Sequence, residues 1–405
     1  MTESQNRVLR IDITGHDHPG ITHALMAIMA PRGVRLLDIG QAAIHDALVL
    51  GMLVELTDDM RSSTLLTDLL LEAHRVGVQI RFTAVTQEEY DHWVLAQSKA
   101  RYVISILGRS LTAAPFEAVS GVITRAGLNI DRIDRLSGRT PLDEQSHRVC
   151  VEFSASGVVR SEDEMRASLL ALTHVFDVDI AFQHDNVYRR NRRLVAFDMD
   201  STLIQTEVID ELARLAGVGD EVARITEAAM RGEYDFQQSF RRRVGLLKGL
   251  PESALHDVIA KVPLMDGAER LIATLRKLGY KTAILSGGFT FMGRELQRRF
   301  GIDHLHANEL DIRDGVVTGE VNTEIVDGQR KAYYLGKLAQ AEGLSMEQVI
   351  AVGDGANDLP MLKLAGLGIA FRAKPLVRQS ASHAISTLGL DGILYLLGVR
   401  DREAL

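Results

Sequence analysis

The fold of this chain is decided by one short stretch, Leu194-Val195-Ala196-Phe197-Asp198-Met199-Asp200-Ser201-Thr202-Leu203. Four apolar residues lead directly to an acid, and a second acid follows two positions later. An apolar run without polar alternation is typical of a strand that is buried on both faces of a parallel sheet. We therefore predict an open α/β sheet with Asp198 and Asp200 at the carboxyl end of this strand, where such sheets bind ligands.

Two carboxylates at this spacing repel each other, so the site favours a bound cation or proton between them. Mg²⁺ is the cation that suits hard oxygen ligands. An isolated Asp-x-Asp pattern could equally be a turn or a helix cap. A second buried run, Val349 to Gly353, also ends in an acid, Asp354, and Gly355-Ala356-Asn357-Asp358 follows it. Asp354 supplies a further hard ligand for a cation bound near Asp198, which favours the metal-site interpretation.

The composition is that of an ordinary globular protein, with 405 residues, 46% of them hydrophobic and 25% charged. This length predicts two to three domains. The net charge of −8 argues against a nucleic-acid partner. The single cysteine, Cys150, excludes an intramolecular disulfide and fits a reducing compartment. Met1 to Asn6 lacks the basic start of a signal peptide, and we find no apolar run long enough to span a membrane. We therefore expect a cytoplasmic protein.

The N-terminal half contains an internal repeat in the order β-α-β-β-α-β, which is the ferredoxin-like split unit. Residues 8–13 and 102–107 are interpreted as the opening strands, each with alternating apolar and polar residues and each followed by a glycine. The other predicted strands are 34–41, 48–56 and 78–84 in the first copy and 128–136, 147–153 and 176–182 in the second. The predicted helices are 21–29 and 62–75, then 115–124 and 163–172.

This repeat resembles a tandem pair of ACT domains, small modules that often bind amino acids in metabolic enzymes. The first copy carries the loop Gly15-His16-Asp17-His18-Pro19-Gly20-Ile21, whereas the loop of the second copy, residues 108–115, lacks the Asp-x-Pro-Gly core. Glycine in such a loop lets backbone N–H groups approach a ligand carboxylate, so the resemblance implies effector contacts near Gly20 and Gly108. The alternative is a pair of dimerisation or packing modules without a ligand. His16 and His18 are interpreted as part of a solvated loop, since no third metal ligand is evident.

Three connecting segments divide the chain. Residues 86–99 hold Trp93 among polar residues and are predicted to bridge the two repeats. Residues 137–146 are predicted to form a long hairpin loop. Residues 183–193 contain four arginines and are interpreted as a solvated boundary near Tyr188. The predicted domains are residues 1–88, 100–184 and 190–405.

The C-terminal half continues with helical patterns at 207–216, 221–231, 236–247 and 252–260, so we predict a helical cap over the first strand at about 205–265. The strand Lys281 to Leu285 then leads to Ser286-Gly287-Gly288, where a hydroxyl and exposed N–H groups could form an anion cradle. Lys331 lies in the first turn of a predicted helix, 329–341. A cation there opposes the helix dipole, which indicates a functional use such as holding a phosphate.

Together, the four ordered segments, D-x-D-S-T, S-G-G, a lysine and G-D-G-A-N-D, resemble the haloacid dehalogenase-like hydrolases, and in detail their phosphoserine phosphatase family. The resemblance implies a doubly wound parallel-sheet core with a helical cap. It implies Asp198 as nucleophile, Asp200 as general acid and base, and Mg²⁺ held by Asp198, Asp354 and the backbone carbonyl of Asp200. Asp358 would support Lys331 or the outer shell of the metal. Substrate contacts are implied for Glu207, Met230, Phe236, Arg243, Ser286, Gly287, Lys331 and Asn357.

The activity implied by this resemblance is hydrolysis of O-phospho-L-serine to L-serine and phosphate, the last step of serine biosynthesis. Feedback by L-serine through the ACT-like half and a homodimer or higher homo-oligomer are further expectations. Two alternatives stay open. The first is a related phosphatase or phosphotransferase acting on another amino-acid phosphate or on a phosphoprotein. The second is an amino-acid sensor with a degenerate hydrolase domain, which the filled catalytic positions disfavour.

Overall fold

The computed structural model describes residues 7–57, 64–110, 112–141 and 148–405. Its contacts divide the chain into two compact units, Met1–Lys99 and Ala100–Leu405, and each is described by itself. Parts of five predicted segments lie outside the described residues, namely 1–6, the start of the helix at 62–75, Leu111, the end of the hairpin loop at 137–146 and the first residue of the strand at 147–153. Among the described residues, no helix combines the length and the apolar character needed to cross a bilayer.

The first unit contains a four-stranded antiparallel sheet in the order β2-β3-β1-β4. Along β1 the side chains of Ile11 and Ile13 are buried, whereas those of Arg10 and Asp12 lie on the other face. The buried face packs on α1 and α3 and forms a core of its own. The elements are β1 (Val8–His16), α1 (Ile21–Met29), β2 (Arg35–Ile44), β3 (Ala47–Glu55), α3 (Leu65–Arg75) and β4 (Val78–Val85).

The predicted bridge at 86–99 is helical over most of its length, as α4 (Gln87–Ala96). Its start is a capping box. The N–H of Glu89 donates to Thr86 Oγ1 at 3.1 Å, and the N–H of Thr86 donates to Glu89 Oε2 at 2.8 Å. This reciprocal pair satisfies backbone donors that would otherwise have no partner in the first turn. The Thr-x-x-Glu pattern was available in the sequence as a signal for this helix.

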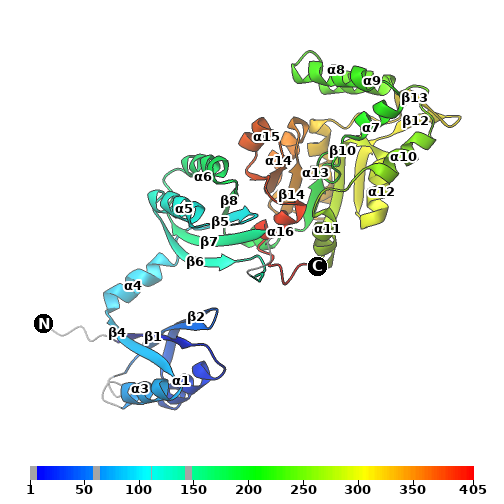
Figure 1. Ribbon diagram of the computed structural model, residues 1–405. Helices are drawn as coiled ribbons and strands as arrows, with labels where there is room; N and C mark the ends of the chain where they lie inside the picture. The colour runs from blue at the N-terminus through cyan, green and yellow to red at the C-terminus, as the bar shows by residue number, and fades with distance from the viewer. Residues whose placement is uncertain (1–6, 58–63, 111, 142–147) are drawn as a thin grey trace. The chain divides into compact units, whose positions relative to one another are not determined.

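The second copy of the repeat has the same topology, with strand order β6-β7-β5-β8 and helices α5 and α6 on one face (Figure 1). Its elements are β5 (Arg101–Gly108), α5 (Ala113–Arg125), β6 (Leu128–Arg135), β7 (Val149–Gly157), α6 (Glu162–Phe176) and β8 (Asp179–His184). The predicted alternation along 102–107 is wrong, because β5 is buried on both faces from Tyr102 onward. The face away from the helices belongs to the core of the C-terminal half, which includes Leu107, Cys150 and Ala181.

The arginine run before Leu194 is only partly solvated, so this interpretation is wrong for Arg189 and Arg192, whereas Arg190 is exposed. Arg189 is 1% exposed and forms an ion pair with Glu152 of β7, which is buried as well. Arg192 is buried, and its guanidinium donates to the carbonyl oxygen of Arg189 at 3.1 Å. A buried charge requires a partner of opposite sign, and the sequence pattern of the run does not reveal that Glu152 supplies one.

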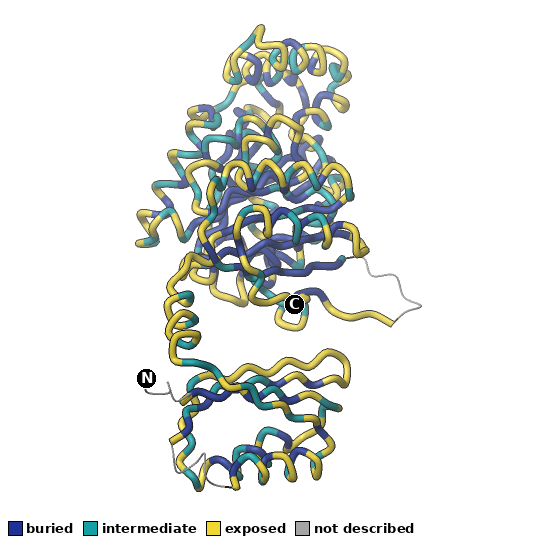
Figure 2. The backbone as a smooth tube through the Cα atoms, turned by 90° about the vertical axis from the view of Figure 1, so that its left-hand side faces the viewer, coloured by how far each residue is buried: buried dark blue, intermediate teal, exposed yellow. Residues whose placement is uncertain are grey.

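The C-terminal half contains a six-stranded parallel sheet in the order β11-β10-β9-β14-β15-β16. The predicted strand at Leu194 is β9 (Leu194–Phe197), near the centre of the sheet, and Figure 2 shows the strands of this half as buried. The other strands are β10 (Lys281–Phe289), β11 (His304–Asn308), β14 (Val349–Gly353), β15 (Leu367–Phe371) and β16 (His383–Ile385).

Helices cover both faces of this sheet, which confirms the doubly wound architecture. Val195 and Phe197 belong to one hydrophobic cluster with residues of α11 and α12, whereas Leu194 and Ala196 belong to another with residues of α13 and α14. Alternate side chains of one strand therefore support two cores, which explains why the run has no polar member. The helices are α11 (Ala268–Lys277), α12 (Thr290–Phe300), α13 (Gly328–Ala341), α14 (Leu359–Leu364), α15 (Pro375–Ser380) and α16 (Ile393–Leu396).

The predicted cap is the part of the chain between β9 and α11. It consists of α7 (Val208–Leu215), α8 (Gly219–Met230), α9 (Phe236–Gly245) and α10 (Ser253–Lys261). A hairpin of β12 (Leu310–Arg313) and β13 (Val316–Val321) packs against α9. In Figure 1, α8 and α9 lie beyond one end of the parallel sheet, and the contact of Phe236 with Gly287 identifies this end as the carboxyl end of the strands.

Candidate active site

The acidic cluster of this site consists of Asp198, Asp354 and Asp358, each of which offers a carboxylate oxygen within 4.8 Å of the others. Asp198 follows β9, and its N–H donates to the carbonyl oxygen of Val352 in β14 at 2.9 Å. This bond fixes the tips of the two central strands together. The predicted convergence of Asp198 and Asp354 is therefore present in the structure.

Lys331 lies beneath this cluster and is wholly buried. Its Nζ is 2.8 Å from Asp198 Oδ2 and 2.6 Å from Asp358 Oδ1. Burial alone would lower the pKa of Lys331, but the attraction of the two carboxylates raises it above its ordinary value. The ammonium therefore stays charged at neutral pH, and Asp358 has the supporting position that the sequence predicted for it.

The electrostatics of the acidic cluster favour a bound cation. Burial, followed by the repulsion of Asp198 and Asp358, raises the pKa of Asp354 to about 8. Burial and the charge of Asp198 raise the pKa of Asp358 to about 7, although Lys331 opposes this shift. A divalent ion would relieve this repulsion, and three carboxylate oxygens are the hard donors that Mg²⁺ prefers. The donor set therefore fits the metal.

Asp200 lies beside the cluster with its carboxyl group held in place. Its Oδ1 accepts a hydrogen bond from the N–H of Val208 at 3.0 Å, at the start of α7. Burial raises the pKa of Asp200 well above its ordinary value, and the charges of Glu207 and Asp198 raise it further. A carboxyl group in this environment is suited to carry a proton near neutral pH. Its other oxygen lies where a side chain at Gly288 would be, so that position requires glycine.

The anion cradle lies at the end of β10. Ser286 is wholly buried, and its Oγ accepts a hydrogen bond from the N–H of Gly288 at 2.9 Å. Gly287 has no room for a side chain, because an added Cβ would be 2.9 Å from the ring of Phe236. Asn357 is half-buried in the loop after β14, directly before Asp358.

Two charged residues of the cap lie near the cluster. Glu207 Oε1 accepts a hydrogen bond from Ser201 Oγ at 2.9 Å. The guanidinium of Arg243 has a buried Nε without a hydrogen-bond partner. Burial lowers the pKa of Arg243, while the charges of Glu207 and Asp210 raise it. An orphaned guanidinium N–H beside a carboxylate is suited to a ligand that carries both charges, and the sequence reasoning missed Asp210 as the second acid facing Arg243.

The structure does not bring Met230 to the acidic cluster. Its side chain is largely exposed at the end of α8, and its Sδ lies 3.9 Å from Lys374 Nζ. The sequence reasoning did not identify two other residues whose side chains hydrogen-bond groups of the site. Thr202 Oγ1 donates to Asp354 Oδ1 at 3.1 Å, and Asn308 hydrogen-bonds Gly287. The hydroxyl in D-x-D-S-T was a signal for Thr202, whereas Asn308 has no local pattern.

The two predicted effector positions lie in different ACT domains, one before a helix and one at the end of a strand. Gly20 precedes α1 with a φ of 100°, a conformation that favours glycine. Gly108 ends β5 opposite Val149, and Leu111 of the same loop lies outside the described residues. His16 and His18 are both exposed, and His18 Nε2 is 2.8 Å from the carbonyl oxygen of Val76.

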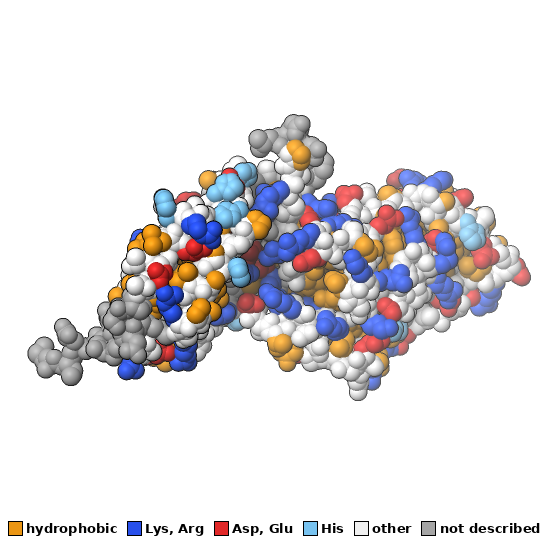
Figure 3. Space-filling view, turned by 90° about the horizontal axis from the view of Figure 1, so that it is seen from below, with side chains coloured by type: hydrophobic (Ala, Val, Ile, Leu, Met, Phe, Trp, Pro, Cys, Tyr) orange, Lys and Arg blue, Asp and Glu red, His pale blue; other side chains and the backbone are white. Residues whose placement is uncertain are grey.

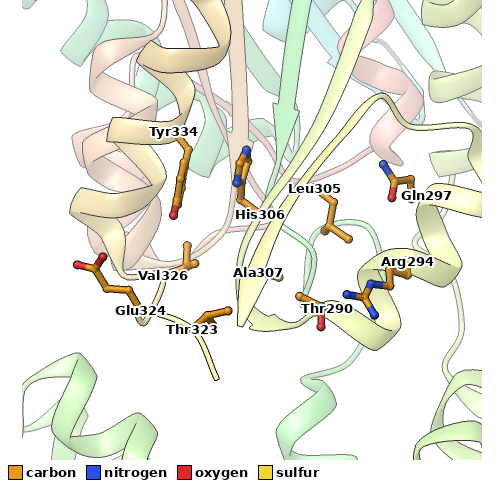
Figure 4. Close-up of a pocket in the computed structure, with 10 residues that line it drawn as sticks. All are labelled: Thr290, Arg294, Gln297, Leu305, His306, Ala307, Thr323, Glu324, Val326 and Tyr334. Atoms are coloured by element: carbon orange, nitrogen blue, oxygen red, sulfur yellow. The ribbon is translucent and has the colours of Figure 1, made fainter. Parts of the chain in front are cut away.

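A pocket of about 500 Å³ lies away from the acidic cluster, at the outer edge of β11. Figure 4 shows the ring of His306 against that of Tyr334 on one side and Arg294 on the other, and the two ring centroids are 4.1 Å apart. None of the predicted catalytic or metal residues lines this pocket. On the face drawn in Figure 3, acidic side chains lie among the more frequent basic ones.

Comparison with protein families assigns three segments. Residues 195–363 match the haloacid dehalogenase-like hydrolases, and residues 7–83 and 100–183 each match an ACT domain. The chain is similar to a phosphoserine phosphatase of Mycobacterium tuberculosis, with 42% identity over 397 residues that cover 97% of this chain and 93% of the relative. It is also similar to a phosphoserine phosphatase of Streptomyces coelicolor, with 43% identity over 396 residues that cover 98% and 93% of the two chains.

Solved structures give the same result. A haloacid dehalogenase family hydrolase from Salmonella enterica aligns with a TM-score of 0.62 at 32% identity, covering 73% of this chain and 98% of that one. A probable phosphoserine phosphatase from Vibrio cholerae aligns with a TM-score of 0.58 at 38% identity, covering 75% and 88% of the two chains. The likeness therefore extends beyond the match at 195–363.

Proposed function

Since the chain belongs to the phosphoserine phosphatase family of the haloacid dehalogenase-like hydrolases, with two ACT domains, we propose that it hydrolyses O-phospho-L-serine to L-serine and phosphate. The observation that carries this proposal is the acidic cluster above Lys331, where Asp198 and Asp354 converge from two strand tips. Such an arrangement would bring a carboxylate nucleophile, a lysine and a cation site within reach of one phosphoryl group.

In the first step, a carboxylate oxygen of Asp198 attacks phosphorus in line, and the bond from phosphorus to the serine oxygen breaks. Asp200 gives its proton to the departing serine oxygen, which the raised pKa of Asp200 permits. The product is an aspartyl phosphate. Asp200 then takes a proton from the water that attacks phosphorus. The bond from phosphorus to the Asp198 oxygen breaks, which releases phosphate and regenerates the Asp198 carboxylate.

Asp198, Asp354 and the backbone carbonyl of Asp200 would hold Mg²⁺, with Asp358 next to them. The ion supplies positive charge that offsets the repulsion between the carboxylates and the phosphoryl oxygens. Lys331 forms an ion pair with Asp198 and so holds the carboxylate of the nucleophile in one orientation. Ser286, Gly287, Lys331 and Asn357 would donate to the phosphoryl oxygens as charge moves in the transition state.

The cap would select the rest of the substrate. Glu207 suits the ammonium group of phosphoserine, and Arg243 suits its carboxylate, because a guanidinium can donate two parallel hydrogen bonds. The orphaned Nε of Arg243 supports this role. Phe236 would close an apolar wall over Gly287, and Met230 would join this wall only after a movement of α8.

The ACT domains would bind L-serine as a feedback effector near Gly20 and Gly108, in a homodimer or a higher homo-oligomer. The matches to ACT domains support a small-molecule effector in general. The domain limits 1–88, 100–184 and 190–405 belong to the same proposal.

The experiment is a phosphate-release assay on the full chain with phosphoserine, with and without Mg²⁺ and added L-serine. Activity should require Mg²⁺, and Asp198→Asn should abolish it; retained turnover would remove Asp198 as the nucleophile. Glu207→Gln and Arg243→Ala should reduce kcat/KM for phosphoserine by at least about 10²-fold, but change that for p-nitrophenyl phosphate far less. Equal losses on the two substrates would contradict the assignment of phosphoserine.

A further inference from the structure

Asn308, the last residue of β11, is a polar side chain that is wholly buried beneath the anion cradle. Its Nδ2 donates to the carbonyl oxygen of Gly287 at 2.8 Å, and its Oδ1 accepts from the N–H of Val326 at 2.8 Å. The two partners define the orientation of the amide, since one is an acceptor and the other a donor. Asn308 therefore connects two backbone segments that are almost 40 positions apart in the chain.

The first of these segments departs from the regular strand pairing. The register between β10 and β11 shifts between Leu285 and Phe289, and Phe289 is paired with Asn308. The carbonyl group of Gly287 lies within this irregular stretch, and the side chain of Asn308 supplies its hydrogen-bond donor. A half-buried carbonyl without a donor would cost stability, and the side chain of Asn308 supplies the donor where the strand pairing is interrupted at Ser286-Gly287-Gly288.

The bond to Asn308 also restrains the peptide unit whose N–H contacts the hydroxyl group of Ser286. Gly287 supplies the carbonyl oxygen, and Gly288 the N–H, of one planar peptide unit. The oxygen is held by Asn308, and the N–H donates to Ser286 Oγ at 2.9 Å. Because Ser286 Oγ already accepts this bond, its own hydrogen remains free to donate. A phosphoryl oxygen in the cleft is the acceptor that the proposed function supplies.

The second segment leads to the lysine of the site. Val326 precedes Asp327, the N-cap residue of α13, whose side chain accepts from the N–H of Arg330 at 3.0 Å. Lys331 follows in the first turn of this helix. The side chain of Gln237 in the cap donates to Asp327 Oδ2 at 2.9 Å. The bond from Asn308 to Val326 therefore fixes the start of the helix that carries Lys331.

We propose that Asn308 is a positioning residue for phosphoryl transfer, which holds the hydroxyl of Ser286 and the ammonium of Lys331 at a fixed separation. It does not touch the phosphoryl group. It acts through the Gly287–Gly288 peptide on one side and through Val326 on the other. The identification of the bound group as a phosphoryl rests on the proposed function, whereas the connection between the two segments does not.

The test uses Asn308→Asp and Asn308→Leu in the full chain, assayed with p-nitrophenyl phosphate and phosphoserine. Asn308→Asp keeps the acceptor for Val326, but it donates to Gly287 only while its carboxyl group is protonated. Burial raises the pKa of such a group into the working range of the assay. We expect kcat of this variant to be near that of the parent at low pH and to fall by about tenfold or more as pH rises. The parent should lack this additional inflection.

Asn308→Leu can form neither bond, so kcat should be low at every pH and inhibition by inorganic phosphate should weaken. Thr274→Val is the matched control, because its buried hydroxyl accepts the N–H of Leu405 at 3.1 Å, far from the site. The control should change thermal stability without changing the pH profile. In a Ser286→Ala background, replacing Asn308 should cost less than in the parent, since the part of its effect that acts through Ser286 is already lost.

The proposal is overturned if Asn308→Asp lowers thermal stability while its kcat, pH profile and phosphate inhibition match those of the parent. It is equally overturned if the Asn308 and Ser286 effects are simply additive. If Asn308→Leu does not fold, the Asn308→Asp variant alone tests the proposal, because its protonated side chain has the shape of asparagine. A parent that hydrolyses p-nitrophenyl phosphate but not phosphoserine would refute the proposed substrate and leave this test intact.

Discussion

The two ACT domains share one topology but differ in how their sheets are buried. In the first, the outward face of β1 carries Arg10 and Asp12, and β2 is exposed along almost its whole length. In the second, β5 and β7 are buried on both faces, and Leu107 and Cys150 belong to the core of the hydrolase half. The same βαββαβ order therefore yields two modules that each have a core between sheet and helices, and only in the second does the other face of the sheet join the core of the catalytic body.

The polar contacts follow the same difference. Asp179 at the start of β8 accepts hydrogen bonds from the N–H groups of Ser386 and Thr387, each at 2.8 Å. Asp391 in the C-terminal segment pairs with Arg148 at 2.6 Å and with Arg270 at 2.9 Å. Packed and hydrogen-bonded residues therefore connect the second ACT domain directly to the hydrolase half.

The largest expected effect comes from truncation. A chain that begins at residue 100 should keep the parent's phosphatase activity and its main thermal transition, because it retains one complete compact unit. A chain that begins at residue 190 loses the β5–β8 sheet and exposes the apolar face that packs on it. We expect its thermal midpoint to fall by about 10 °C or more, together with aggregation. Scanning calorimetry and phosphate release compare the two. Equal stability of both truncated chains would abolish the distinction between the ACT domains.

An intermediate effect is expected for the buried ion pair. Arg189→Met leaves Glu152 buried without a partner and should lower the free energy of unfolding by about 3–5 kcal/mol, measured by urea denaturation. Replacing both partners, as Arg189→Met with Glu152→Leu, should restore most of this loss. The matched change in the first ACT domain is Asp68→Asn, which breaks the partly exposed pair with Arg32 and should cost less than about 1 kcal/mol. Similar losses at the two sites would contradict the comparison.

The smallest expected effect is on the pH dependence of the unfolding free energy. His383, which lies beside the second ACT domain, and His18, in the first, should change it with opposite signs. His383 of β16 is buried beside β8, with Nε2 3.0 Å from the carbonyl oxygen of Phe182. Burial lowers the pKa of His383 to about 4. The unfolded chain therefore binds more protons between about pH 6.5 and 4, and stability falls as pH falls through this window, by up to about 3 kcal/mol. His383→Gln should flatten the measured dependence of unfolding free energy on pH.

His18 in the first ACT domain behaves in the reverse manner. Hydrogen bonds to the carbonyl oxygens of Val76 and Pro19 raise its pKa. Its contribution is therefore present at low pH and is lost as pH rises above the ordinary histidine range. NMR titration of the two imidazoles checks both signs. A pKa of His383 near 6.5 would show that its site is open to water.

Much of the hydrolase half could be predicted from the sequence. The apolar run at Leu194 and the run at Val349 each gave a central strand that ends in an acid, and the two strands meet as the sheet rules require. The errors occurred where a residue's partner lies far away in the chain. Arg189 looked solvated because Glu152, 37 positions earlier, supplies its charge. Asn308 escaped notice because its partners, Gly287 and Val326, belong to two other segments.

Residues close together in the chain were enough to predict the order of the elements, the two repeats and the set of acids at the strand ends, because periodicity and strand-end chemistry are local properties of the chain. Only the three-dimensional packing shows which ACT sheet is buried on both faces, which arginines lie in the core, and which distant side chain holds the peptide next to Ser286. These outcomes depend on which distant groups exclude water from a residue, and no local pattern of side chains encodes that information.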